Sequence, residues 1–344
     1  MRFASDNTSG VCPEVLAAIA EESARYGPAY GDDRRSAELV DALSEVFERP
    51  VGVYPVATGT AANSLSLTAL NPPWGGVICH REAHIAVDEL AAPSAIGGGL
   101  TLLPLAGDHG KLTPEVVDDA FVRRENGVHT VPITGLSITQ VTETGTCYGV
   151  DELAALAEVA TRRGLRIHMD GARFANAVVA SGATPAELTW RHGVDVLSFG
   201  ATKGGALAAE AIVSFDPTLD EVIQRHRKRF GHLLSKQRLA AAQILGWVTD
   251  GVWLRHASHA NRLAARLGAG LDASGMALSG PVEANMAFVR MTDDQATALR
   301  TAGASFYTQV VDPGLAEARF VTSWSSSESE VDDLIRAAGQ IIAA

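Results

Sequence analysis

The chain has 344 residues, of which 47% are apolar and 20% are charged, and its formal net charge is −12. This length suggests two domains, and this apolar content is enough for a large core, which excludes a disordered chain. The acidic balance argues against a nucleic-acid partner, because the one basic stretch, at 225–229, is short and typical of a single helix face.

The sequence also bears on compartment and metal binding. The first ten residues lack the apolar core of a signal peptide, and no apolar run is long enough to span a bilayer. Cys12, Cys79 and Cys147 lie far apart without a Cys-x-x-Cys spacing, so neither a disulfide framework nor a zinc site is predicted. We therefore expect a cytoplasmic protein with no membrane partner and no bound metal.

Helical and strand-like patterns alternate through the first two thirds of the chain. A helix is predicted over 36–49, where apolar residues recur at helical spacing. Short β-rich runs follow at 51–56, 77–79, 101–105, 130–139, 166–169 and 194–199, with helical stretches such as 151–163 between them. Buried strands that alternate with helices predict an α/β fold, with a mainly parallel sheet covered on both faces.

The pattern changes after residue 245. One long helix is predicted over 254–271, and strand-like runs follow at 284–291, 304–310 and 317–324. A last helix begins near Ser327, which forms a capping box with Glu330. We therefore predict a large α/β domain at 1–245, including the N-terminal segment, and a smaller α+β domain at 246–344.

The first chemical motif follows the strand-like run at 51–56. Thr58, Gly59 and Thr60 lie where that strand gives way to a helix of small residues. The free N–H groups and the dipole of a helix N-terminus make such a turn an anion site. An ordinary turn capped by threonine is the alternative. The motif is neither GxGxxG nor a Walker A loop, which disfavours a dinucleotide or ATP.

A second motif, HMDGAR, places Asp170 at the carboxyl end of the strand-like run at 166–169. Ligands bind at that edge of open α/β sheets. A carboxylate there needs a cationic partner or several hydrogen-bond donors. The partner is either Arg173, as an internal ion pair, or a protonated ring nitrogen on a bound cofactor.

A third motif centres on Lys203, which follows the run at 194–199 and precedes Gly204 and Gly205. The glycines suggest that something bulky lies close to the backbone. A lysine at a strand end is usually only solvated. However, the carboxyl ends of parallel strands share one edge, so Lys203, Asp170 and Gly59 are expected close together.

The fourth motif is Arg319, a lone cation inside the apolar run at 317–324. It forms either an ion pair at the rim or a bidentate clamp on a substrate carboxylate. Together the four motifs supply an anion cradle, a carboxylate for a pyridinium nitrogen, a Schiff-base lysine and a carboxylate clamp. Pyridoxal 5'-phosphate requires this set from a protein.

The motifs resemble those of low-specificity L-threonine aldolases, a group of fold-type I pyridoxal-phosphate enzymes in the beta-eliminating lyase superfamily. The resemblance covers nearly the whole chain and is carried by FASDN from Phe3, YGDD from Tyr30, HMDGARFANA from His168 and SFGATKGG from Ser198. It implies retro-aldol cleavage of an L-β-hydroxy-α-amino acid, with threonine or allo-threonine favoured, to glycine and an aldehyde. It also implies a homodimer or homotetramer.

The resemblance assigns roles to residues as well. Lys203 would form the Schiff base with the cofactor, and Asp170 would bind the pyridine nitrogen. The remaining roles fall to Thr58, Gly59 and Thr60 at the phosphate, Arg173 beside the ring, His84 stacked on the ring with Glu89 five residues on, and Ser5 and Arg319 at the substrate carboxylate.

One segment departs from the family pattern. Many members carry Glu-Asn-Thr-His where this chain has ITQVTE at 138–143, so a second active-site histidine is absent and Gln140, Thr142 or Glu143 takes its neighbourhood. Because an ordinary imidazole has a pKa of about 6.5, we expect His84 also to take the β-hydroxyl proton. The alternatives are another pyridoxal-phosphate reaction (β-elimination, transamination or racemisation) and a binding protein without turnover.

Overall fold

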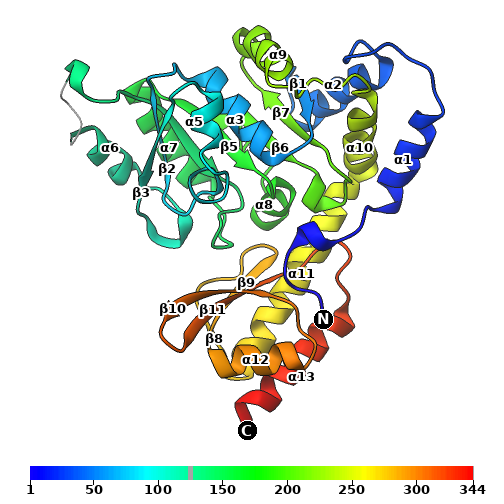
Figure 1. Ribbon diagram of the computed structural model, residues 1–344, viewed down its shortest axis with the longest axis vertical. Helices are drawn as coiled ribbons and strands as arrows, with labels where there is room; N and C mark the ends of the chain where they lie inside the picture. Colours follow the sequence, from blue (N-terminus) through cyan, green and yellow to red (C-terminus); the bar gives the residue numbers. More distant parts are fainter. Residues whose placement is uncertain (123–126, 344) are drawn as a thin grey trace.

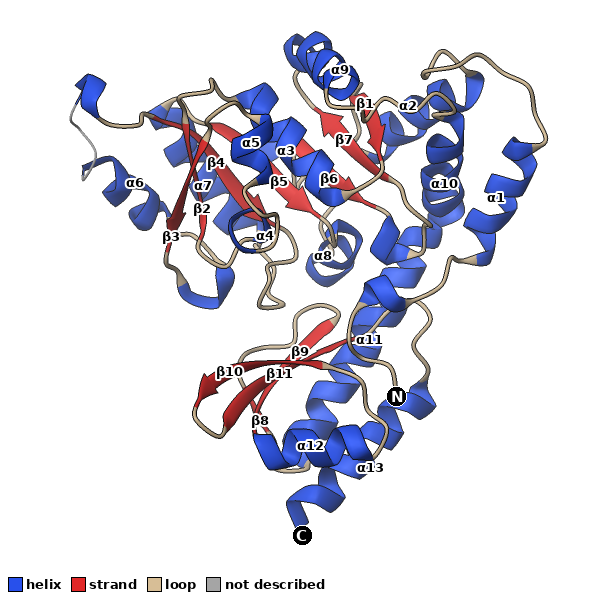
Figure 2. Ribbon diagram, in the orientation of Figure 1, coloured by secondary structure: helices blue, strands red, loops and turns tan. Residues whose placement is uncertain are grey.

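The structure is a computed structural model that describes residues 1–122 and 127–343. Within these residues it contains a seven-stranded and a four-stranded β-sheet, and helices pack on both (Figures 1 and 2). The two sheets lie at opposite ends of the molecule, and α11 (Val252–Ala273) runs from one toward the other.

The strands of the large sheet lie in the order β1-β7-β6-β5-β4-β2-β3. Their bounds are Gly52–Val56 for β1, Gly76–His80 for β2, Thr101–Leu105 for β3, Ile133–Thr139 for β4, Arg166–Gly171 for β5, Val194–Gly200 for β6 and Glu210–Ser214 for β7. β7 is antiparallel to both of its neighbours, β1 and β6, and the other pairs are parallel. β1 therefore points the same way as β6, and the carboxyl ends of β1, β2, β4, β5 and β6 share one edge.

Helices cover both faces of the large sheet (Figure 2). Their bounds are Pro13–Ser23 for α1, Arg34–Val46 for α2, Gly59–Leu70 for α3, His84–Val87 for α4, Ala92–Ile96 for α5, Pro114–Val122 for α6, Val150–Arg163 for α7, Phe174–Ser181 for α8, Asp220–Arg229 for α9 and Arg238–Val248 for α10. The largest core cluster joins the strands to α2, α7, α8 and α10. A second cluster joins β1, β6 and β7 to α3 and α9 on the other face.

Alternation along β5 determines which face carries the polar residues. Ile167 and Met169 are buried in the large core cluster, and neighbouring strand residues point to the opposite face. His168 and Asp170 therefore point toward the α3 face, where Asn63 of α3 donates a 2.8 Å hydrogen bond to Asp170 Oδ2.

The small sheet has the order β10-β11-β9-β8, and all of its pairs are antiparallel. The strands are Ala277–Leu278 for β8, Met286–Thr292 for β9, Tyr307–Asp312 for β10 and Leu315–Val321 for β11, and the accompanying helices are Asp293–Thr301 for α12 and Glu328–Ala343 for α13. Sequence analysis predicted neither β8 nor α12. Only half of the expected capping box forms: Ser327 Oγ accepts from the Glu330 N–H at 3.3 Å, but the Glu330 carboxylate pairs with Arg2.

The first residues of the chain belong to the small core rather than to the large one. Phe3 is fully buried there and packs edge-on against Phe320, with ring centroids 6.4 Å apart. Its N–H donates to Ser305 O and its carbonyl accepts from Val321 N–H, both at 2.9 Å. Residue 245, where we predicted a domain boundary, lies inside α10, and that division stays a prediction.

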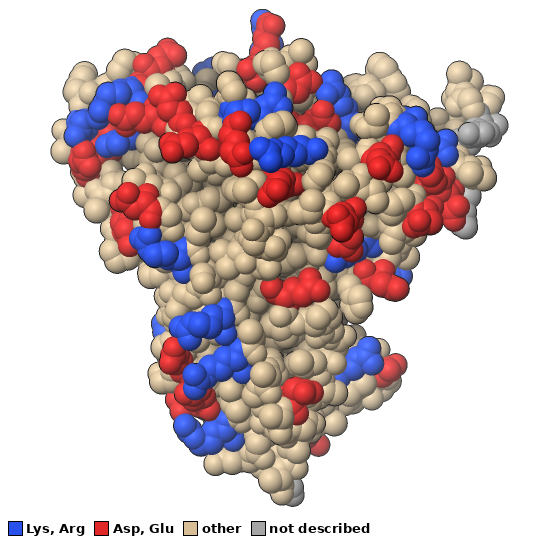
Figure 3. Space-filling view, turned by 180° about the vertical axis from the view of Figure 1, so that it is seen from behind, with Lys and Arg blue, Asp and Glu red and all other residues tan. Residues whose placement is uncertain are grey.

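Acidic and basic side chains are interspersed over the face in Figure 3. Among the residues that the structure describes, no helix combines the length and the apolar character needed to cross a membrane.

Candidate active site

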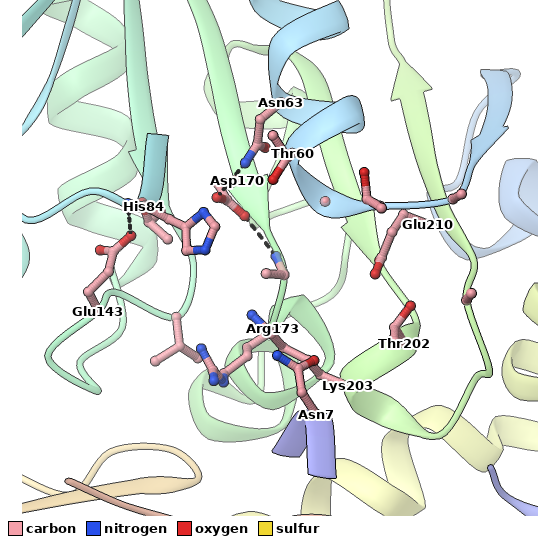
Figure 4. Close-up of a pocket in the computed structure, with 17 residues that line it drawn as sticks. Asn7, Thr60, Asn63, His84, Glu143, Asp170, Arg173, Thr202, Lys203 and Glu210 are labelled. Atoms are coloured by element: carbon pink, nitrogen blue, oxygen red, sulfur yellow. Dashed lines mark hydrogen bonds between the residues drawn. The ribbon is translucent and has the colours of Figure 1, made fainter. Parts of the chain in front are cut away.

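A pocket of about 270 Å³ opens at the shared carboxyl edge of the large sheet, and residues of all the expected cofactor motifs line it (Figure 4). Thr58, Gly59 and Thr60 come from the turn after β1, Asp170 from the end of β5, and Lys203 from the turn after β6. Segments separated by more than a hundred residues therefore meet in one cavity, as the strand pattern predicted.

The turn after β1 begins helix α3. Thr58 is its N-cap, and the Thr58 Oγ1 accepts from the Ala61 N–H at 3.2 Å. The first N–H groups of a helix have no acceptor within that helix, so Gly59 and Thr60 present theirs to the pocket. A Cβ added to Gly59 would meet nothing within 4 Å. The turn is thus both open and electropositive.

Asp170 is 4% exposed and accepts two hydrogen bonds, from Asn63 Nδ2 at 2.8 Å and from the Ala172 N–H at 3.0 Å. Arg173 is not its ion-pair partner. The Arg173 guanidinium instead makes a bidentate pair with Asp6, at 2.7 and 2.9 Å. Of the two partners that sequence analysis left open for Asp170, the internal ion pair is therefore excluded.

Lys203 lies in the turn Thr202–Gly204 and reaches the pocket without a carboxylate in contact among the described residues. Burial lowers the pKa of its amine, and the nearby Arg173 guanidinium lowers it further. Both effects favour the neutral amine, which is the nucleophilic form. The glycine pair does not make room for a ligand, however: a Cβ on Gly204 would lie 2.2 Å from the Trp247 ring.

His84 begins α4 and forms a hydrogen-bonded chain with its neighbours. Its Nδ1 lies 2.9 Å from Glu89 Oε1, and the same oxygen accepts from Asn63 Nδ2 at 2.8 Å. The hydrogen bond to Glu89 raises the pKa of His84, against the opposing effect of burial. Asn63 thereby connects His84, through Glu89, to Asp170.

The two residues expected at the substrate carboxylate lie outside the lining of this pocket. Arg319 is half-buried on β11, with its guanidinium over the Tyr307 ring at 5.4 Å. Burial and the nearby Arg173 lower its pKa, and its Nε is buried without a hydrogen-bond partner among the described residues. Ser5 Oγ accepts from the Asn7 N–H at 3.2 Å, and Asn7 is the residue that reaches the pocket.

Two glutamates complete the lining, from opposite sides (Figure 4). Glu143 lies beside His84, and Glu143 Oε1 accepts from the His84 N–H at 2.7 Å. Glu210 begins β7 and accepts from the Ala201 N–H at 2.8 Å. Burial raises the pKa of each carboxyl to about 7, and Asp170 adds to the shift in Glu143.

Comparison with known proteins identifies the family. The description "Beta-eliminating lyase" matches residues 2–294. A low-specificity L-threonine aldolase of Pseudomonas aeruginosa is 43% identical over 97% of this chain and 96% of its own, and one from another Pseudomonas strain is 42% identical over 97% of this chain and 95% of its own. A solved threonine aldolase of Leishmania major is 27% identical, covers 99% of each chain and has a TM-score of 0.94.

This chain is a member of the beta-eliminating lyase family. The resemblance found in the sequence and the expected fold class, fold-type I with a smaller α+β part, are both confirmed. Family membership also raises the question of whether this pocket fits pyridoxal phosphate.

The donor set of the pocket fits that cofactor. The phosphate would lie at the N–H groups of Gly59 and Thr60, where the anion site is open. Asp170 is a buried carboxylate that no cationic side chain contacts within 1–122 and 127–343, which suits a protonated pyridine nitrogen. Lys203 is the amine available for a Schiff base.

Sequence analysis missed Asn63, Asp6 and Glu210 as parts of the site. Asp6 lies within the FASDN motif and Asn63 follows Thr60 by three residues, but a sequence does not show which side chains these two residues contact. The sequence does indicate that Glu210 is unusual, because this single carboxylate directly precedes the mostly apolar run AIVSF. A carboxylate is seldom buried, and Glu210 is buried in the structure.

Proposed function

We propose that this protein is a pyridoxal-phosphate-dependent aldehyde lyase that cleaves L-threonine or L-allo-threonine to glycine and acetaldehyde. The observation that carries the proposal is the Lys203 amine, which no carboxylate of the described residues contacts and which shares one pocket with the Asp170 carboxylate and the open N-terminus of α3. The names of the relatives that match nearly the whole chain support the same reaction.

Bound pyridoxal phosphate supplies an electron sink attached to the amino group of the substrate. The protein residues have four tasks around it. Lys203 would hold the cofactor through its amine, and Asp170 would keep a proton on the ring nitrogen. Gly59 and Thr60, with Thr58 capping the helix, bind the phosphate. His84 covers the ring and is held in place by Glu89.

Arg319 and Arg173 form the positive side of the site. Asp6 neutralises Arg173, whereas no carboxylate contacts Arg319 among the residues that the structure describes. A substrate carboxylate would supply that missing partner in a bidentate contact. We propose that Arg319 thereby orients the amino acid, and Ser5 remains a second candidate for the same carboxylate.

We further propose that the enzyme works in the cytoplasm as a homodimer or homotetramer. The three cysteines are free, which suits a reducing compartment. Large apolar side chains are exposed in segments next to pocket residues, namely Val87 at 56%, Leu90 at 100% and Leu207 at 58%. A contact with another subunit would cover these side chains. Light scattering on the purified protein measures the assembly.

The experiment is a product assay on the protein loaded with pyridoxal phosphate. Threonine, allo-threonine, phenylserine and serine are each supplied, and the aldehyde and the amino-acid product are quantified separately. Equimolar glycine and acetaldehyde from threonine or allo-threonine support the proposal. A keto acid, a D-amino acid or ammonia without aldehyde would instead show transamination, racemisation or β-elimination. A protein that binds the cofactor and converts none of the four would be a binding protein.

A further inference from the structure

The loop after β4 lacks the histidine of the family pattern and offers three polar side chains in its place. The first, Gln140, is fully buried. Its Oε1 accepts from the Tyr148 N–H and its Nε2 donates to the Tyr148 carbonyl, both at 2.9 Å. Both ends of the amide are therefore engaged in holding the loop, and Gln140 does not line the pocket.

The second, Thr142, is also fully buried and engaged within the loop. Its Oγ1 accepts from the Thr146 N–H at 3.1 Å and lies 2.8 Å from the Thr146 hydroxyl. It lies outside the lining of the pocket as well. Neither residue can therefore reach a substrate without the loop being rebuilt.

The third, Glu143, does line the pocket (Figure 4). One carboxylate oxygen, Oε1, is fixed by the His84 N–H at 2.7 Å. The Thr139 side chain, which also lines the pocket, is a second donor toward this carboxylate and lowers its pKa. The other oxygen, Oε2, is inaccessible to solvent and makes no hydrogen bond of ordinary geometry among the described residues. A buried carboxylate oxygen without a donor is costly, and a substrate hydroxyl would supply the donor.

We infer that Glu143 is the acid–base group that accepts the β-hydroxyl proton of the substrate during cleavage. The inference rests on the proposed retro-aldol activity and identifies the residue that serves the hydroxyl. In this step the O–H bond breaks and its proton moves to Glu143. The Cα–Cβ bond breaks as the C=O bond of the aldehyde forms, and its electron pair remains with the glycine fragment, where one proton returned to Cα restores the balance.

The acidity of Glu143 suits that task. Burial, and next the neighbouring Asp170 carboxylate, raise the pKa of Glu143 to about 7. A general base works best when its pKa is close to the working pH. The titratable and charged groups that interact with it come from β2, α4, the Tyr148 loop, β5 and the start of α8, namely Cys79, His84, Tyr148, Asp170 and Arg173.

His84, which the sequence suggested for the same proton, is less suited to it. Its Nδ1 is engaged by Glu89 at 2.9 Å, and that contact raises the pKa of His84. A raised pKa favours the protonated imidazolium, which cannot accept a further proton. We therefore assign cofactor stacking to His84 and proton transfer to Glu143.

Three full-length variants test the assignment. Glu143→Gln keeps an oxygen that can accept from the His84 N–H but cannot take a proton, and Glu143→Asp keeps a carboxylate on a shorter side chain. Glu283→Gln is the matched control, because Glu283 also accepts from a main-chain N–H of this loop, that of Cys147 at 2.6 Å, but is exposed and lies outside the pocket.

Three measurements are made on each protein: cofactor and glycine binding by absorbance, acetaldehyde release from threonine across pH, and infrared difference titration of protonated carboxyl groups. We expect Glu143→Gln to bind cofactor and glycine within about twofold of wild type. Its aldehyde release should fall by about a hundredfold or more, the usual contribution of a general base. Glu143→Asp should recover part of that loss, and Glu283→Gln should behave as wild type.

The infrared titration does not depend on turnover. Wild type should show a carboxyl that titrates near pH 7 and that is missing in Glu143→Gln. The inference is overturned if Glu143→Gln releases aldehyde at near the wild-type rate, if it loses the cofactor, or if no such carboxyl disappears. A wild-type protein that releases no aldehyde overturns the proposed function itself, and the inference with it.

Discussion

Replacing Asp6 with Asn should destabilise the fold far more than the same change at an exposed ion pair. Asp6 is 2% exposed and makes a bidentate pair with Arg173, whose side chain is 11% exposed. Asn keeps the shape but removes the charge, so the guanidinium stays buried without a counterion. Breaking a buried pair in this way costs about 3–5 kcal/mol. Because Asn can still accept one hydrogen bond, we expect Asp6→Asn to lower the free energy of unfolding by about 3 kcal/mol, the lower end of this range.

Asp332→Asn is the matched control. Asp332 also makes a two-oxygen contact with an arginine, Arg266, but the two side chains are 40% and 47% exposed. Exposed pairs contribute about 0.2–1 kcal/mol. Urea unfolding, followed by circular dichroism at one fixed protein concentration, measures both variants against wild type.

The pH dependence supplies a second readout for Asp6. Burial is the largest single effect and would raise its pKa, but the Arg173 guanidinium, the Lys203 amine and the Asn285 amide together outweigh burial, and the pKa is lowered overall. A lowered pKa contributes stability that is present above the unfolded value of about 3.9 and is lost as pH falls through the folded value. The difference in free energy of unfolding between wild type and Asp6→Asn should therefore be constant near neutral pH and should shrink below about pH 4. If Asp6→Asn were no more destabilising than Asp332→Asn, the reasoning would be refuted.

Substitutions at two further residues, Lys203 and Arg319, test the proposed site. Lys203→Ala should lose both the visible absorbance of the bound cofactor and turnover. Borohydride reduction of the wild type, followed by peptide mass spectrometry, should find the cofactor attached to Lys203. A cofactor attached to another lysine would contradict the assignment. Arg319→Ala should raise the KM for threonine at least tenfold, which corresponds to about 1.4 kcal/mol, while cofactor absorbance is unchanged. Arg319→Lys should recover little of that loss, because lysine cannot form the planar two-point contact of a guanidinium with a carboxylate. An unaltered KM and kcat in Arg319→Ala would contradict the proposed contact between Arg319 and the substrate carboxylate.

The sequence predicted the architecture because periodicity and turn residues are local signals. A buried strand followed by Gly59, by Asp170 or by Lys203 placed each at the carboxyl edge, and the pocket contains all three. The strand β7 was missed, because it is buried along its whole length and is therefore a short apolar run without alternation. By periodicity alone, such a run cannot be distinguished from a buried segment of a helix.

The pairing of charges could not be predicted in the same way. Arg173 follows Asp170 by three residues, which made a local pair plausible, but its carboxylate partner is Asp6, 167 residues away in the chain. The glycines after Lys203 show the same limit. The sequence indicates that a bulky group lies close to the backbone at Gly204, and only the packing in the structure shows that this group is the Trp247 ring. The choice among Gln140, Thr142 and Glu143 likewise depended on hydrogen bonds that no pattern displays.

The N-terminal segment has a consequence for the order in which the protein is completed during synthesis. Met1 and Phe3 are synthesised well before Gly303 and Val321, which they contact in the fold, and Asp6 precedes Asn285, which it contacts besides Arg173. These contacts span about 280 to 320 residues of chain. The large sheet can assemble while translation continues, but Phe3 has no core to enter until β11 exists. Phe3 therefore lacks its core partners until synthesis has passed β11.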